Sequence, residues 1–495
     1  MIIVPQKYEF EFKNYIKNKI NLITNKITDD LIDNIFNVSD NKYLKIVSTL
    51  EKNIRDAILT ILKETIAFFD DNFRESLERK KYYHINVRHD ERTIKTIFGD
   101  IFIVRTYYET KDREDHFYFI DKLLELEKYD RYDAIYKSKA LDLAIKTNQK
   151  LGGEIIGSEV STIEENITNK IDNNIVPRQT IYSWIRKWVL PTIDYPPIET
   201  DSKNLYVMAD EKWIHEQIHT EQTDEEKEKK HFIMSKCFVC FTGITQKGTR
   251  RSLDNRMVFI TSSSTPWNDF LDFVTKIYDF EKFENIVFLS DAGKWLLSGA
   301  KDLKLYSHNN IIFCLCEFHA RQKINRITTN EEDRKELNKY IDENNKKSFV
   351  NKMKLIKEVK KDNENKLKKL IEYENYIINH WNKIQNMFKS ECRSSMESHI
   401  SHCIASHFSS RPKAYSKTNI EKLLKLQEAK LNGINIQSLY LKSYKNTETI
   451  TLKKEELNFS IFENNNSSNL PIIENGANNS LLKALLGLSH GNSYI

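Results

Sequence analysis

Residues 205–212 of the chain read LYVMADEK, a short apolar run that ends on two acidic residues, Asp210 and Glu211. An apolar run of this length between polar residues is typical of a buried strand. A carboxylate at the end of such a strand lies at the edge of a sheet, next to buried surface but within reach of water. The stretch therefore predicts a strand that brings an acidic group to a sheet edge.

A second stretch has the same design. Residues 285–291, NIVFLSD, form another apolar run, and this run ends on Asp291. Two aspartates at strand ends of one sheet can point toward a shared site, and divalent cations such as Mg²⁺ prefer oxygen ligands. Asp210 and Asp291 are therefore the first candidates for a metal site.

The order of elements around these two stretches predicts a fold. Strand-like segments follow at 231–244 and 256–261, then a helical segment at 267–280, and later a strand at 311–315 with a helix after it. The charged run at 220–230 predicts a solvated loop. Three successive strands and then alternating helices and strands predict a ribonuclease-H-like domain, with helices on a mixed sheet. In that fold the first and fourth strands are neighbours, which would bring Asp210 and Asp291 together.

A third acidic residue lies in residues 392–415. Apolar residues recur there at every fourth position: Met396, Ile400, Ile404 and Phe408. Glu397 is one residue from this stripe, so we expect it at the edge of a packed helix and partly enclosed. An enclosed carboxylate is costly unless a cation compensates its charge.

A candidate DNA-reading helix lies at residues 177–188. An apolar stripe runs along one side of it at helical spacing: Ile181, Trp184, Ile185 and Trp188. The opposite side carries polar and basic residues: Arg178, Gln179, Ser183, Arg186 and Lys187. Such a side could contact phosphates and base edges as the recognition helix of a helix-turn-helix does. An ordinary solvated helix has the same pattern, so both interpretations stay open.

The sequence predicts a multidomain α+β protein, in which a ribonuclease-H-like α/β core is interrupted by a helical insertion. Its regions are a helical N-terminal region (1–90), a small antiparallel β unit (91–130), a helix-turn-helix-like region (131–195), the first part of the core (204–327), the helical insertion (328–390), the completion of the core with the third acid (391–432) and a C-terminal tail (433–495) with a short helix at 480–488. In the β unit, Arg105, Tyr107 and Tyr108 could stack on bases, but we favour a role in covering the core. The lysine-rich insertion could follow DNA phosphates or could simply be solvated.

Composition narrows the class of protein. The net charge of +5 provides no global basic field, although the 76 Lys and Arg could be segregated onto one face. Six cysteines in 495 residues do not resemble a disulfide framework, which favours a reducing cytosol. We see no signal peptide and no apolar run of the ~18–20 residues that a membrane span needs.

A zinc site is the main rival to a magnesium site. Its ligands would come from Cys237 and Cys240, or from Cys314 and Cys316 with His319. Both cysteine pairs fall in expected strands, where side chains alternate between faces, and no Gly or Pro forms the turn that a zinc knuckle needs. We therefore favour buried free cysteines.

Five segments resemble a known family. They are TIFGDIFIVRTYY (96–108), ADEKWIH (209–215), SDAGKWL (290–296), CEFHARQKI (316–324) and MESHISHCIASHFSSRPKAYSK (396–417). On these segments the chain resembles the bacterial insertion-sequence transposases of the ISLre-two family, long described as an uncharacterised protein family. The resemblance extends from about residue 90 to the C-terminus. The chain departs from the family pattern at residues 393–395 and 413–415.

The resemblance implies a DDE transposase whose acidic triad is Asp210, Asp291 and Glu397. Two Mg²⁺ or Mn²⁺ ions would be held there, with Asp210 bridging both, to catalyse cleavage and transfer of DNA strands. His319 would contact the metal ligands without binding the metal itself. Glu211 is a rival ligand, but adjacent strand residues point to opposite faces, so we expect it to face solvent. Arg411 would lie near DNA.

The resemblance also implies the partners and the location. They are double-stranded DNA at the element ends and target, a homo-oligomer assembled on DNA, and the bacterial cytoplasm with its nucleoid. Two alternatives remain: a catalytically inactive DNA-binding descendant, and a ribonuclease-H-like nuclease without strand transfer. Three intact acids favour an enzyme over the first, and the candidate DNA-reading helix favours a transposase over the second.

Overall fold

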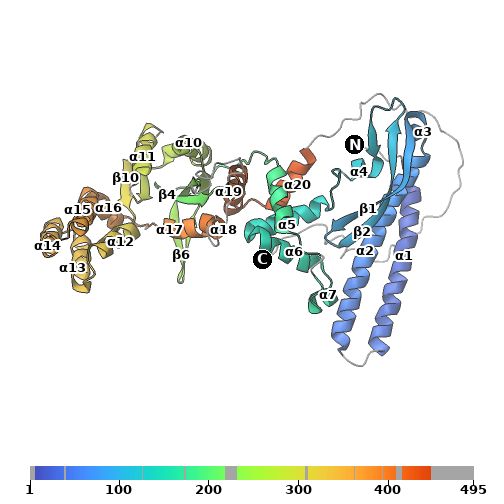
Figure 1. Ribbon diagram of the computed structural model, residues 1–495, viewed down its shortest axis with the longest axis horizontal. Coiled ribbons are helices and arrows are strands. Elements are labelled where there is room, and N and C mark those ends of the chain that lie inside the picture. Colours follow the sequence, from blue (N-terminus) through green and yellow to red (C-terminus); the bar gives the residue numbers. More distant parts are fainter. Residues whose placement is uncertain are drawn as a thin grey trace. The chain divides into compact units, whose positions relative to one another are not determined.

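The computed structural model describes ten stretches of the chain, namely residues 6–37, 41–124, 126–171, 174–217, 231–291, 293–306, 310–361, 363–392, 394–408 and 415–446. The protein is of mixed α+β class, with many helices and several separate sheets (Figure 1). This confirms the coarse fold class that the sequence predicts. Among the described residues, no helix has both the length and the apolar character that a membrane crossing requires.

The N-terminal region is a pair of long antiparallel helices, α1 (Gln6–Asn37) and α2 (Lys42–Glu75) (Figure 1). Polar contacts join them along their length: Asn53 Nδ2 donates to Asp30 Oδ2 at 2.8 Å, and Asn34 Nδ2 donates to Thr49 Oγ1 at 3.2 Å. The short helix α3 (Leu77–Tyr82) follows. The helical character expected for this region is confirmed.

The small β unit is a three-stranded antiparallel sheet, with α4 (Phe119–Leu123) after it. Its strands are β1 (Tyr83–Thr96), β2 (Gly99–Thr110) and β3 (His116–Tyr118). The first strand begins eight residues before the predicted boundary at 91. The boundary is wrong because the first half of the strand is mostly polar and exposed, and lacks the apolar alternation that would indicate a strand. Arg105 is buried, pairs with Asp90 and Asp121, and lies 3.7 Å from the centre of the Tyr118 ring. This supports a structural role for Arg105 rather than base stacking.

Four helices form the next region: α5 (Ala134–Lys146), α6 (Gln149–Val160), α7 (Ile163–Ile167) and α8 (Arg178–Lys187). The predicted apolar stripe of α8 is largely confirmed, because Ile181, Ile185 and Trp188 are buried. Helix α6 comes very close to the segment before α8. A Cβ atom on Gly153 would lie 2.1 Å from the carbonyl oxygen of Val176, so only glycine fits at this position.

The central sheet has five strands: β4 (Asn204–His215), β5 (Phe232–Phe241), β8 (Met257–Thr261), β9 (Asn285–Ser290) and β10 (Asn310–Leu315). Their spatial order is β10-β9-β4-β5-β8. Strands β4, β5 and β8 pair antiparallel, whereas β9 pairs parallel to both β4 and β10. The prediction that β4 and β9 are adjacent in the sheet is confirmed. A small hairpin, β6 (Gly243–Lys247) with β7 (Arg250–Asp254), was not predicted.

The two faces of this sheet pack against different helices. One face, with Val207 and Phe288, packs on α10 (Pro266–Ile277) and α11 (Lys294–Tyr306). The other face, with Met208 and Leu289, joins an apolar cluster with residues of α5 and α8 and of the later helix α19 (Lys417–Leu431). The helical turn η2 (Phe280–Lys282) precedes β9, and α12 (Glu317–Ile327) follows β10.

Side chains of α19 and of the residue after it, Asn432, cover the edge of the sheet. Ile260 N donates to Glu428 Oε2 at 2.8 Å, Val258 N donates to Asn432 Oδ1 at 2.8 Å, and Asn432 Nδ2 donates to the carbonyl of Val258 at 2.7 Å. An uncovered edge strand would otherwise present a row of unpaired backbone groups. Strand β8 is thereby protected without a sixth strand.

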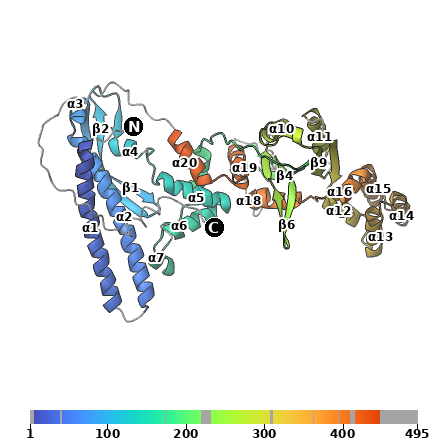
Figure 2. The ribbon, with the colours of Figure 1, turned by 180° about the vertical axis from the view of Figure 1, so that it is seen from behind.

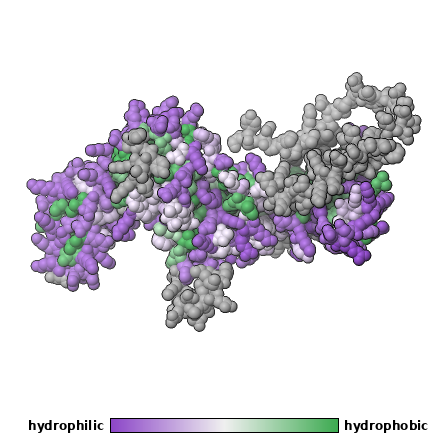
Figure 3. Space-filling model, turned by 90° about the horizontal axis from the view of Figure 1, so that it is seen from above, coloured by the Kyte–Doolittle hydropathy of each residue, from purple (hydrophilic) through white to green (hydrophobic). Residues whose placement is uncertain are grey.

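The region between residues 328 and 390 is helical. It contains α13 (Glu331–Asp342), α14 (Lys346–Val359), α15 (Glu364–Asn379) and α16 (Trp381–Lys389) (Figure 2). These helices pack around an apolar cluster that includes Phe349 and Ile377. Some of its lysines are paired, as Lys352 is with Asp333 and Glu336. The face of this region that is seen in Figure 3 is mostly hydrophilic.

The C-terminal elements are α17 (Met396–Ile400), a π-helical turn η3 (Ser401–Ala405), α18 (Ser406–Phe408), α19 and α20 (Ile436–Asn446). Helix α20 lies within the stretch expected to be tail, and its residues Leu439 and Tyr440 are buried. The packed structure thus continues beyond the predicted boundary at 433. The charged run at 220–230, Arg411 and the predicted helix at 480–488 lie outside the described residues.

Candidate metal centre on two neighbouring strands

Asp210 and Asp291 stand at matching positions on neighbouring parallel strands. In the register of β4 with β9, Tyr206 is paired with Val287 and Met208 with Leu289. Each aspartate comes two residues after a member of the second pair. Since side chains alternate along a strand, both aspartates continue the face that buries Met208 and Leu289. The structure therefore brings the two predicted carboxylates together. The prediction that the first strand ends at Asp210 is wrong, because β4 continues to His215 through its pairing with β5, whereas Asp291 directly follows β9.

The carboxyl group of Asp210 is electrostatically perturbed. Burial raises its pKa to about 6, and the nearby charges of Asp291 and Glu211 act in the same direction. The backbone N–H of Glu211, which donates to Asp210 Oδ1 at 2.8 Å, and the imidazole of His319 oppose this rise. A half-buried carboxylate beside a second carboxylate is typical of a functional site.

Asp291 is held by contacts from two directions. Its Oδ1 accepts a hydrogen bond from the backbone N–H of Gly293 at 2.9 Å. Its backbone carbonyl accepts one from the hydroxyl of Tyr376 at 2.6 Å. Tyr376 belongs to α15, and burial raises the pKa of its hydroxyl, so the group remains a donor at neutral pH. The helical region thus touches the candidate site, a contact that no sequence signal predicts.

His319 approaches the aspartates from α12. The backbone N–H of Cys316 donates to the carbonyl of Ser290 at 2.8 Å, which fixes the start of α12 beside the end of β9. A hydrogen bond with the Cys316 side chain raises the pKa of His319 despite burial, and both aspartates raise it further. His319 therefore lies where the sequence expects a supporting group.

Glu211 points away from Asp210. Its Oε2 accepts a hydrogen bond from the indole N–H of Trp295, on the sheet face opposite to Asp210. The expectation that it faces away from the site is confirmed. The expectation that it faces open solvent is wrong, because its side chain is half-buried and bonded.

Glu397 does not join the aspartates in this arrangement. The four stripe residues Met396, Ile400, Ile404 and Phe408 are buried as predicted. The side chain of Glu397 is nevertheless exposed, so the prediction that it is partly enclosed is wrong. Its helix does begin near the site, since the backbone N–H of Ser395 lies 3.4 Å from Met208 Sδ. In the part of the chain that the structure describes, no three His, Cys, Asp or Glu side chains form a group able to hold a metal ion.

The cysteines are buried thiols. All six are free and buried, and Cys237 and Cys240 lie on opposite faces of the sheet. Burial acts to raise the pKa of the Cys316 thiol, but hydrogen bonds with His319 and the charge of that imidazole outweigh burial, and the pKa is lowered. The alternation of side chains in β5 is the reason that its two cysteines do not converge.

The candidate DNA-reading residues have different surroundings. The side chains of Arg178, Gln179, Arg186 and Lys187 are exposed on α8, whereas Ser183 is half-buried. Helix α8 is fixed to α19, because Lys422 Nζ donates to the backbone carbonyl of Trp188 at 2.7 Å and also bonds that of Arg186. The polar side of α8 is therefore presented by a firmly held helix.

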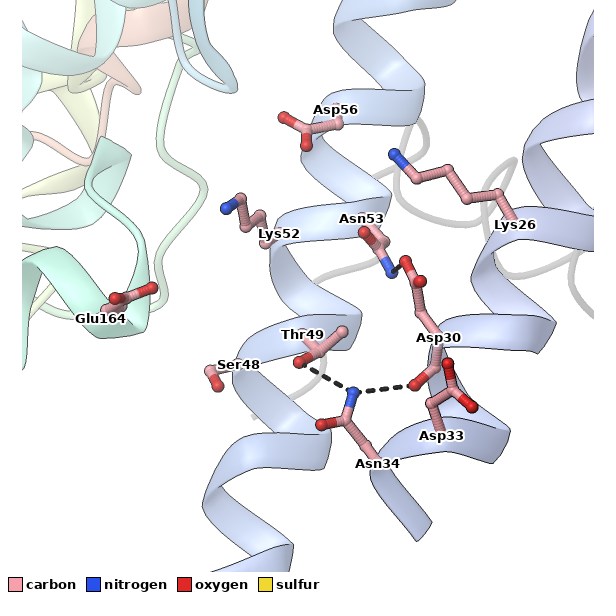
Figure 4. Close-up of a pocket in the computed structure, with 10 residues that line it drawn as sticks. All are labelled: Lys26, Asp30, Asp33, Asn34, Ser48, Thr49, Lys52, Asn53, Asp56 and Glu164. Carbon is pink, nitrogen blue, oxygen red and sulfur yellow. Dashed lines mark hydrogen bonds between the residues drawn. The ribbon is translucent and has the colours of Figure 1, made fainter. Parts of the chain in front are cut away.

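A separate polar pocket lies between α1, α2 and α7 (Figure 4). Its lining includes Asp30, Asn34, Thr49 and Asn53, which bond one another across the helix pair. Lysines 26 and 52 also line it. The pocket is therefore a solvated gap between α1 and α2, and the hydrogen bonds between the two helices explain its polar lining.

The paired aspartates fit a hard divalent cation in donor type and charge. Two adjacent carboxylates, one with its pKa raised by burial, would be relieved by a positive ion between them. Their oxygens are the ligands that Mg²⁺ and Mn²⁺ prefer. The exposed Glu397 does not contribute a third carboxylate in the arrangement described.

Comparisons with known proteins give one consistent result. The model of an uncharacterised protein family, UPF0236, matches residues 31–443. Curated relatives come from Caldanaerobacter subterraneus subsp. tengcongensis and are named UPF0236 proteins. One is 24% identical over 443 residues, covering 87% of this chain and 85% of the relative, and another is 24% identical over 436 residues, covering 86% of each. The chain belongs to the uncharacterised protein family UPF0236.

Proposed function

We propose that this protein is a DDE-type DNA transposase that cleaves and transfers strands at the ends of an insertion sequence. The observation that carries the proposal is the matching position of Asp210 in β4 and Asp291 directly after the parallel strand β9. The proposal agrees with the resemblance of the segments around both aspartates to insertion-sequence transposases.

The sheet supports a ribonuclease-H-like core. Along the chain, the antiparallel strands β4, β5 and β8 come first, and the strands β9 and β10, which run parallel to β4, come later. In the spatial order β10-β9-β4-β5-β8, the first and fourth strands of the chain, β4 and β9, are adjacent. This is the arrangement expected from the order of elements in the sequence. Helices α13–α16 then correspond to the proposed insertion in that core.

In the proposed reaction, the residues of the chain hold and orient the metal ions and the DNA. Asp210 and Asp291 would bind two Mg²⁺ or Mn²⁺ ions, with Glu397 as the third ligand. The ions would supply activation of the attacking oxygen and stabilisation of the leaving oxygen at phosphorus. His319 would keep Asp210 and Asp291 in position through its charge, and Tyr376 would hold the backbone at Asp291.

DNA recognition is proposed for the helix-turn-helix-like region. The exposed Arg178, Gln179, Arg186 and Lys187 would contact the element ends, with Ser183 at the margin. A transposase of this kind would act on double-stranded DNA as a homo-oligomer in the bacterial cytoplasm, associated with the nucleoid.

Cleavage of an element-end duplex tests the proposal. We expect the parent protein to cleave such DNA only with Mg²⁺ or Mn²⁺, and we expect Asp210→Asn to bind the same DNA without cleaving it. The exposed Asp272→Asn variant is a matched control that should cleave like the parent. Equal cleavage by Asp210→Asn and the parent would refute the role of Asp210. Cleavage without joining of the cut end to a target would favour a nuclease.

One observation favours a second candidate, a catalytically inactive DNA-binding descendant. The exposed side chain of Glu397 leaves the two aspartates without a third carboxylate. Specific binding to element ends with no cleavage under any divalent metal would support this candidate.

A further inference from the structure

The helix that carries Glu397 is interrupted by a π-helical turn. Helix α17 ends at Ile400, η3 occupies Ser401–Ala405, and α18 continues to Phe408. A π turn bonds residue i to i+5 and so accommodates one more residue than an α turn, and such turns are frequent at functional sites. The π turn therefore decides which residues of α17 share a face with Ile404 and Phe408.

In an unbroken α-helix, Glu397 rather than Met396 would face the sheet. Each residue of an α-helix turns by ~100°, so seven residues complete two turns to within about 20°. Glu397 is seven residues before Ile404, and thus would align with it. Met396 would point about 80° away from Ile404, whereas Ile400 would stay within about 40°. In the structure the π turn reverses this choice, since Met396 is buried and Glu397 is exposed.

We infer that the π turn at Ser401–Ala405 is a switch, and that its conversion to an α turn rotates Glu397 from solvent onto the face of the sheet that carries Asp210 and Asp291. This inference rests on the proposed function and concerns the assembly of its site. The arrangement described would be the resting state, with two acids in position and the third outside.

The surroundings of α17 are compatible with such a rotation. The helix is only five residues long. Its start touches β4 through the backbone N–H and hydroxyl of Ser395 and the hydroxyl of Ser394, and all three groups donate to the Met208 sulfur, which is a weak acceptor. Rotation removes one apolar side chain, Met396, from its buried position. The exposed residues Ser401 and His402 lie on the outer side of the π turn and impose little steric resistance.

The charge of the metal ions explains why the π turn would convert only when the ions and DNA are bound. Without a cation, a third carboxylate would be repelled by Asp210 and Asp291. With cations and DNA in place, the same carboxylate becomes a ligand. The π turn thus keeps Glu397 in water until its charge can be compensated.

Oxidation of methionine tests the rotation independently of catalysis. The buried Met396 should be protected from peroxide in the free protein and should become several-fold more reactive when element-end DNA and Mn²⁺ are both present. Met387, which is fully buried on α16, should stay protected in both states. If Met396 remains protected in a complex that cleaves DNA, the switch does not exist.

Deletion of His402 tests the need for the extra residue. Without His402 the π turn can close as an α turn with Met396 seven residues before the former Ile404, so the buried contacts of the resting state are preserved. We expect the deletion variant to fold and to bind DNA, and to lose cleavage by about 10²-fold or more.

The outcomes separate this inference from the proposed function. A deletion variant that cleaves like the parent overturns the switch and leaves the transposase proposal intact. A parent protein that cleaves no element-end DNA overturns the transposase proposal itself. If the deletion variant fails to fold, the oxidation of Met396 still decides.

Discussion

Asp210 and Asp291 each lie two residues beyond one member of the paired residues Met208 and Leu289, on strands that run parallel. The chain therefore holds two carboxylates side by side, with Asp210 inside β4 and Asp291 directly after β9. Asp291 stands at the carboxyl end of its strand, where open α/β sheets bind their ligands. Burial, with repulsion from Asp291, disfavours the charged form of Asp210 and raises its pKa to about 6. Such a cost is typical of a functional site, where a ligand compensates it.

Replacement of Asp210 by Asn should stabilise the protein at neutral pH without metal. The raised pKa means that the folded state holds the proton more tightly than the unfolded chain does. The contribution of Asp210 is thus favourable below pH ~4 and is lost as the pH rises to about 6. At pH 7 we expect Asp210→Asn to add about 2 kcal/mol, after a discount for partial exposure. Thermal unfolding between pH 4 and 8 in EDTA measures this.

The exposed Asp272→Asn variant is the control for that experiment and should leave the free energy of unfolding unchanged at every pH. A loss of stability in Asp210→Asn at pH 7 would contradict the burial and repulsion described for this carboxyl group.

Replacement of Gly153 by Ala should be strongly destabilising. The added Cβ would lie 2.1 Å from the carbonyl oxygen of Val176, so α6 and the segment before α8 would have to move apart. We expect a loss of about 3 kcal/mol in unfolding free energy, together with weaker DNA binding, because α8 is displaced. Chemical denaturation measures the first effect. As a comparison, Gly248→Asn, at a position with φ +61° and open space around it, should cost much less.

Two replacements of Glu428 should differ in their effect on stability. Glu428→Ala removes the acceptor of the Ile260 N–H and should cost about 2 kcal/mol, since a buried donor is left unpaired. Glu428→Gln keeps an acceptor and removes a carboxylate whose pKa is raised by burial, so it should be neutral or stabilising at pH 7. Equal destabilisation by both variants would show that the charge, and not the sealing of β8, matters.

Single replacements of Arg178, Arg186 and Lys187 by Ala should weaken DNA binding. Each removed phosphate contact should reduce the slope of log K against log salt by about 1. Fluorescence anisotropy at several salt concentrations measures the slope. Lys276→Ala, at an exposed position on α10, is the control. Unchanged slopes for all three variants would mean that α8 is only a solvated helix.

The parts of the fold that follow from local pattern could be predicted. The apolar runs that end on Asp210 and Asp291 are strands, and the order of elements correctly makes β4 and β9 neighbours. The polar first half of β1 could not be predicted. It is a strand because its backbone pairs with β2, and it has no apolar face that the sequence pattern could reveal.

The candidate site was only partly predictable for a similar reason. The contact of Tyr376 with the backbone of Asp291 joins residues 85 positions apart and has no local signal. The stripe from Met396 to Phe408 was identified, but its spacing of four residues also fits a π turn, and that turn moves Glu397 outward. Backbone hydrogen bonding, which residue spacing does not specify, decides the position of this acid.

The binding of Mn²⁺ to the DNA-free protein tests the central claim most directly. Calorimetric titration of the parent, Asp210→Asn, Asp291→Asn and the control Asp272→Asn would measure the dissociation constants. We predict that the parent and the control bind Mn²⁺ alike, and that each of the other two variants binds at least about tenfold more weakly, because both carboxylates share the ion. Unchanged affinity in both Asp210→Asn and Asp291→Asn would contradict a metal centre at these two carboxylates.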